Sequence, residues 1–102
     1  MASELLRAQW EFLWMLGVLL QEAHIRGYKV TMGDVFARKG HMKGSLHYVK
    51  LAVDLNLFRG GRYLTSSKAH LPLGIFWEGL GGSWGGRFGD GNHYSLSYRG
   101  KK

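Results

Sequence analysis

The alternation of residue types in KLAVDLNLF (residues 50–58) constrains the fold more than any other feature of the chain. Successive side chains of a β-strand point to opposite faces of its sheet. The side chains on one face would be Leu51, Val53, Leu55 and Leu57, and those on the other Ala52, Asp54, Asn56 and Phe58. The pattern therefore predicts a strand with one packing side and one side where a carboxylate lies next to a small residue.

A helix is predicted over residues 3–26. Ser3 suits its N-cap, and Gly27 is typical of the position just after a helix ends. The residues that recur at helical spacing, and are expected to form one buried stripe, are Leu6, Trp10, Leu13, Leu16 (or Gly17) and Leu20. Trp14 lies next to this stripe, and core packing is the expected role of these aromatic side chains.

The rest of the chain predicts shorter elements joined by turns. We expect strands at 28–36 and 93–98, a hairpin turn in RGGRYLT (59–65), a helix from Pro72 to Gly81, and glycine-punctuated loops at 37–44 and 83–92. This order of elements, with hairpin connections, predicts an α+β fold in which an antiparallel sheet packs against helices. At 102 residues the chain is expected to form a single domain, residues 1–102.

The composition restricts the kinds of site and partner. The chain has no cysteine, which excludes disulfides, a thiolate zinc site and a cysteine nucleophile, so His, Asp or Glu must hold any metal. Lys and Arg total 14 against 7 Asp and Glu, a formal net charge of +7 that suits an anionic polymer. Because the basic residues are dispersed along the chain, a nucleic acid is not the expected partner.

Neither a membrane span nor a secretory signal is expected. The longest apolar run, FLWMLGVLL (12–20), is far shorter than the roughly 20 residues that cross a bilayer. The first residues lack a positively charged region, and no small-residue cleavage site follows them. The protein is therefore expected to be made in the cytoplasm and to remain there until something releases it.

Two histidines and two aspartates form a candidate metal site. His93 and Asp54 would lie on the open faces of their strands and would meet if those strands were neighbours. His47 could join them only if the chain bends, because seven extended residues span roughly 23 Å. Two imidazoles and one carboxylate leave a zinc coordination position for water, and Asp90 could serve as the base. The spacing alone also allows a capping aspartate, an ordinary strand histidine and a simple GDGN turn.

Two motifs resemble a known family. SLHYVKLAVD (45–54) matches the Ser-x-His-x-x-x-x-Ala-x-Asp signature of the zinc D-alanyl-D-alanine carboxypeptidases and L-alanyl-D-glutamate endopeptidases. DGNH (90–93) matches their second signature, an acidic residue followed three positions later by histidine. The family includes vancomycin-resistance dipeptidases and several bacteriophage endolysins. The chain resembles their compact phage-encoded branch from about Val30 to Tyr98.

The resemblance implies a small α+β domain of the hedgehog/DD-peptidase type with one Zn²⁺ on His47, Asp54 and His93. It also implies that Asp90 acts as general base and acid, and that Ser45 lies beside the metal.

The substrate-binding residues are less well matched by the family pattern. Arg38 is the nearest stand-in for the family's substrate-binding arginine, with Lys39 or Lys43 as alternative cations. Trp84 is expected to wall the substrate groove. One position departs from the motif itself: Lys50 replaces the glycine that usually follows the first histidine by three residues.

The resemblance implies a zinc metallopeptidase, a hydrolase of bacterial peptidoglycan that cuts its stem peptides and lyses the wall. The expected protein is a monomer made in the host cytoplasm, acts on the wall after release, and uses its basic surface on anionic envelope polymers. The alternatives are a D-alanyl-D-alanine carboxypeptidase, and a non-catalytic wall-binding or virion protein that retains the metal site. A basic nucleic-acid-binding domain has only the net charge in its favour.

Overall fold

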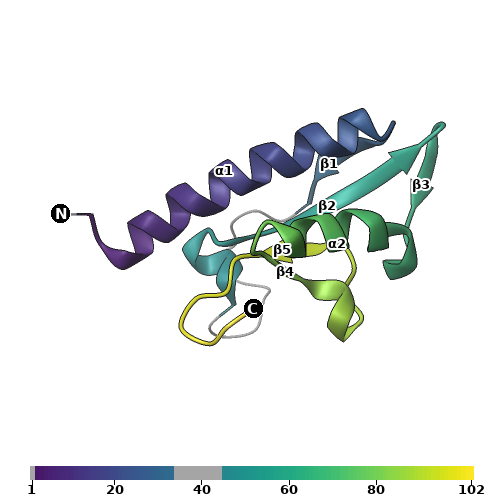
Figure 1. The fold of residues 1–102 in the computed structure, drawn as a ribbon. Helices are drawn as coiled ribbons and strands as arrows, with labels where there is room; N and C mark the ends of the chain where they lie inside the picture. Colours follow the sequence, from purple (N-terminus) through teal and green to yellow (C-terminus); the bar gives the residue numbers. More distant parts are fainter. Residues whose placement is uncertain (1, 34–44) are drawn as a thin grey trace.

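The computed structural model describes residues 2–33 and 45–102 and shows an α+β domain (Figure 1). Its helices and strands, in chain order, are α1 (Glu4–Ile25), β1 (Lys29–Met32), β2 (Ala52–Arg59), β3 (Arg62–Leu64), α2 (Leu71–Gly79), β4 (Ser83–Trp84) and β5 (His93–Ser95). Three short 3₁₀ helices are η1 (Leu46–Val49), η2 (Ser67–His70) and η3 (Gly85–Phe88). The predicted fold class is confirmed.

Every strand pairing within the described residues is antiparallel, and β2 lies at the centre. The strand order is β1-β2-β5-β4, and β3 also pairs with β2. Leu57 and Phe58 pair with β1 and with β3 at once, so these two strands lie on opposite edges of β2. β5 also pairs with β2 on the edge away from β1. The strands β3 and β5 therefore lie one after the other along the same edge of β2.

The alternation of β2 places the core on one face of the sheet. Leu51, Val53, Leu55 and Leu57 are buried in a cluster with side chains of both helices. Within that cluster, Trp77 of α2 makes edge contacts with Phe12 of α1 and Tyr94 of β5, at ring-centroid distances of 5.8 and 6.1 Å. Asp54, being one residue out of phase with the leucines, points to the opposite face.

The prediction of which face of α1 is buried was wrong. Of the predicted stripe only Leu16 is fully buried, while Trp10 and Leu13 are 60% and 68% exposed, and Trp14 is 63% exposed. The buried side chains of α1 are Phe12, Met15, Leu16, Leu19 and Ala23. Residues 12–20 are apolar around the whole helix, so more than one stripe has the correct spacing, and packing against the sheet and α2 decides between them.

The structure also changes some predicted boundaries. β5 stops at Ser95 instead of residue 98, α2 ends at Gly79 instead of Gly81, and the predicted loop 83–92 contains β4 and η3. β1 covers the first part of the predicted strand 28–36, and residues 34–36 lie outside the described residues, as does the predicted loop 37–44. Among the helices of the described residues, none has the length and apolarity needed to cross a membrane.

Candidate metal centre

The register of β2 and β5 brings Asp54 and His93 together. The two residues are direct Cα partners in this antiparallel pair, although they lie far apart in the chain. His93 Nδ1 is 3.4 Å from Asp54 Oδ1. On the other side of β2, the Gly33 amide donates to the Asp54 carbonyl at 2.7 Å, which fixes the backbone that carries the carboxylate. The predicted meeting of these two side chains is confirmed.

The 3₁₀ helix η1 delivers the third side chain. Ser45 caps it, with its hydroxyl accepting from the His47 amide at 3.2 Å. Lys50 ends it in the left-handed conformation, at φ 61° and ψ 38°, and the chain then enters β2. Because a 3₁₀ helix rises only about 2.0 Å per residue, this turn shortens the path between His47 and Asp54. His47 Nε2 consequently lies 3.4 Å from Asp54 Oδ1.

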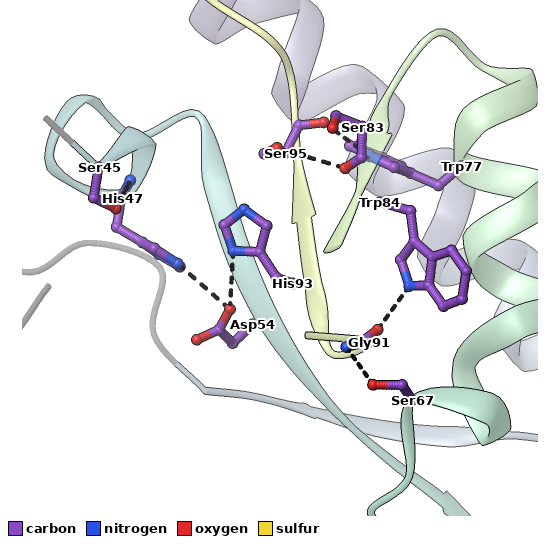
Figure 2. Close-up of polar contacts among 10 residues, drawn as sticks. All are labelled: Ser45, His47, Asp54, Ser67, Trp77, Ser83, Trp84, Gly91, His93 and Ser95. Carbon is purple, nitrogen blue, oxygen red and sulfur yellow. Dashed lines mark hydrogen bonds and ion pairs between the residues drawn. The ribbon is translucent and has the colours of Figure 1, made fainter. Parts of the chain in front are cut away.

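The spacing of the three side chains fits ligands of one ion better than it fits hydrogen bonds. Figure 2 shows the Asp54 carboxylate between the two imidazoles. Both nitrogen–oxygen distances, 3.4 Å, exceed the usual range of about 2.7–3.2 Å for N–H···O hydrogen bonds. Two ligand atoms that each lie about 2.0–2.1 Å from a tetrahedral zinc are about 3.3–3.4 Å apart. One ligand atom from each residue lies within 4.8 Å of the others.

The burial of the group also favours a cation. His47 and His93 are only 2% and 8% exposed. Asp54 Oδ1 and His93 Nε2 are buried and make no hydrogen bond with the described part of the chain. Buried polar atoms without a partner are uncommon and cost about 1–3 kcal/mol each. The His47–Asp54–His93 group could therefore hold a metal ion, with two imidazoles and a carboxylate as ligands.

Two hydrogen bonds to Gly91, which we call the Gly91 clamp, hold the turn that precedes His93, and no sequence pattern predicted them. The Trp84 indole donates to the Gly91 carbonyl at 2.7 Å, and the Gly91 amide donates to the Ser67 hydroxyl at 2.9 Å (Figure 2). A side chain at Gly91 would collide with the backbone of Ser67. The glycine of DGNH was the available signal, but its two partners are distant in sequence.

Asp90 lies in this turn and is exposed. Its backbone carbonyl accepts from the His93 amide at 3.1 Å, which ties the aspartate to the start of β5. The Asp90 carboxylate forms neither an ion pair nor a hydrogen bond with the described residues, so it is available to a ligand.

The predicted substrate-binding residues have different outcomes. Ser45 is half-buried, and its hydroxyl caps the turn that carries His47. Trp84 is 4% exposed, and its ring packs closely on Gly74 and Gly86, so a substrate could touch little of it. This position favours a supporting role for Trp84 over the predicted groove wall. Arg38, like the alternatives Lys39 and Lys43, lies outside the described residues.

Comparison with protein-family models, with curated proteins and with solved structures found no match to this chain. The family resemblance of the two motifs therefore remains a prediction from the residues themselves.

Proposed function

We propose that the protein is a zinc-dependent peptidase that cuts peptide bonds in bacterial peptidoglycan. The observation that carries this proposal is the convergence of His47, Asp54 and His93, from η1, β2 and β5, into one group. Each imidazole has a nitrogen 3.4 Å from Asp54 Oδ1, and one ligand atom from each residue lies within 4.8 Å of the others. These are the positions that match the two peptidase motifs. An accidental motif match would not require its three residues to meet in space.

The side chains of the group suit zinc. Imidazole nitrogen and carboxylate oxygen are common zinc ligands, and three protein ligands are typical of catalytic sites. When bound, the ion would supply Lewis acidity, which polarises a carbonyl and lowers the pKa of a water molecule to about 7. Magnesium and calcium prefer oxygen ligands, which makes them a poorer match to two imidazoles.

Asp90 is the proposed general base and acid. Its exposed carboxylate belongs to the turn held by the Gly91 clamp, three residues before His93. It would accept a proton from the attacking water and pass it to the departing amine, and the proton lost by the new carboxylic acid then converts this amine to an ammonium group. Arg38 is proposed to bind a carboxylate of the substrate, where the fork of an arginine offers two parallel hydrogen bonds.

The test combines elemental analysis with a lysis assay on permeabilised bacterial cells. We expect one zinc per chain in the purified wild type, zinc without lysis in Asp90→Ala, and neither in His47→Ala. His24→Ala is the matched control, since His24 is an exposed histidine of α1 outside the group, and it should keep both properties. An Asp54→Ala protein that lacks zinc but lyses cells fully would refute the mechanism.

Mass spectrometry of the digested wall identifies the bond. A cut at L-alanyl-D-glutamate or at a cross-bridge would support the proposed endopeptidase, whereas loss of a terminal D-alanine alone would indicate a carboxypeptidase. Zinc binding with no peptide product would indicate a wall-binding protein.

A further inference from the structure

One edge of β2 has a gap beside the candidate metal centre, between its pairings with β5 and β3, and we call this gap the notch. β5 pairs with β2 at residues 52–54 and β3 pairs with it at 57–59, along the same edge. Leu55 and Asn56 lie between these two pairings, and the Leu55 amide donates across the gap to the Asn92 carbonyl at 2.9 Å. A cavity of about 170 Å³ opens at this place, between the end of β3 and the turn before β5.

The notch lies next to the candidate metal centre, because its lining includes residues adjacent in the chain to Asp54 of β2 and to His93 of β5. Asn56 lines the notch and lies on the same face of β2 as Asp54, two residues or about 7 Å further on. On the opposite wall, residues 89–92 line the notch and lead directly into His93. A substrate chain that crosses the metal centre can therefore extend into the notch.

The charge of the notch is opposite to that of the whole molecule. Asp90 is the one charged side chain among the described residues that line it, in a chain with a net charge of +7. The other polar residues of its lining are Asn56, Tyr63, Thr65, Ser67, His70 and Asn92. A carboxylate with neutral neighbours favours an ammonium group over an anion.

His70 adds a hydrogen-bond donor. It is 2% exposed, and its Nδ1 lies 2.8 Å from the Tyr94 hydroxyl. Burial lowers the pKa of His70, so the imidazole is neutral. The Tyr94 hydroxyl has no other hydrogen-bond partner among the described residues, and donation to Nδ1 is the arrangement in which its buried O–H is satisfied. A neutral imidazole then carries its own proton on Nε2.

We propose that the notch binds the residue on the amine side of the cut bond, with its newly formed ammonium group against Asp90 and its carbonyl oxygen accepting from His70 Nε2. This inference rests on the proposed peptidase function for the nature of the ligand. The proposed position agrees with the role of Asp90 as general acid. The amine that receives a proton from the Asp90 carboxyl group would remain beside it after the bond is cut. An amino group followed by a carbonyl is present at the amino terminus of every peptide product.

The test compares two small probes by NMR titration of the zinc-loaded protein at a pH of about 6.5, where an α-amino group is protonated. Alaninamide carries the ammonium and the carbonyl, whereas N-acetylalaninamide lacks the ammonium. We expect alaninamide to bind at least fivefold more tightly and to shift the signals of Thr65 and Asn92. Asp90→Asn should abolish this preference, and Glu11→Gln, a matched change at an exposed carboxylate of α1, should leave it intact.

Equal binding of the two probes, or a preference that survives in Asp90→Asn, would overturn the inference. Shifts confined to His47 and His93 would overturn it too, since they would mean that the amine binds the metal. The titration involves no hydrolysis, which separates the two proposals. Lysis by a protein that binds both probes equally would refute only the inference about the notch. A preference for alaninamide in a protein that does not lyse cells would contradict the peptidase function.

Discussion

Lys50 has a positive φ, as only Arg99 does among the other non-glycine residues that the structure describes. It ends η1 in the left-handed conformation, at φ 61°, and so reverses the chain between two ligands. Residues with a Cβ pay roughly 1–2 kcal/mol in this conformation, whereas glycine adopts it freely. The family motif that the chain resembles has glycine at this position, so the left-handed backbone is consistent with that motif despite the substitution.

We therefore predict that Lys50→Gly is more stable than Lys50→Ala by about 1 kcal/mol in the free energy of unfolding. Both variants lose the lysine side chain and whatever it contacts, so their difference isolates the backbone conformation. Urea denaturation of the two proteins measures it. If the alanine variant proved equally stable, the left-handed turn between His47 and Asp54 would be contradicted.

The three residues of the candidate metal centre differ in how far their positions could be predicted from the sequence. Asp54 and His93 follow from alternation, because a strand fixes which face each side chain takes and the register then makes them Cα partners. The position of His47 depends on the turn made by η1. From the sequence it could be expected only that the chain bends between His47 and Asp54, without the form of the bend. The role of Trp84 could not be predicted, because its contact with Gly91 depends on how β4 packs against the turn before β5.

At the scale of elements, α1 is a helix in which the spacing of apolar residues does not identify the buried face. Its run of apolar residues surrounds the helix, so periodicity could not identify the buried side, whereas the strict alternation of β2 identified it at once. Leu19 lies on the buried face and is 0% exposed, and Leu13 lies on the outer face. The two leucines therefore report on opposite sides of one helix.

We predict that Leu19→Ala lowers the free energy of unfolding by about 2–5 kcal/mol, the usual cost of a large-to-small change in a core. Leu13→Ala should change it by no more than about 0.5 kcal/mol, as exposed substitutions usually do. The two variants share the same change in helix propensity, so each controls for the other. Urea denaturation gives both values, and a large loss in Leu13→Ala would mean that the outer face of α1 is covered in solution.

At the scale of the whole molecule, the candidate metal centre depends on the complete fold. Its ligands come from η1, β2 and β5, and the clamp on Gly91 adds contacts from β4 and η2. Since these elements span residues 46–95, an unfolded chain holds no comparable group. Metal binding is therefore expected to stabilise folding, because the ion would bind the folded state far more strongly than the unfolded one.

The final prediction uses this coupling. At a free zinc concentration 100 times the Kd, binding should add about 2.7 kcal/mol to the free energy of unfolding. A domain of this size gains about 4–8 °C in Tm for each kcal/mol, so a chelator should lower Tm by roughly 10–20 °C. Calorimetry with and without the chelator measures the shift. Asp54→Asn keeps the shape of the side chain but loses its charge, so its Tm should respond much less to the chelator. An equal response in the variant would show that zinc stabilises the protein from another site, and an unchanged Tm in the wild type would mean that the three side chains hold no zinc.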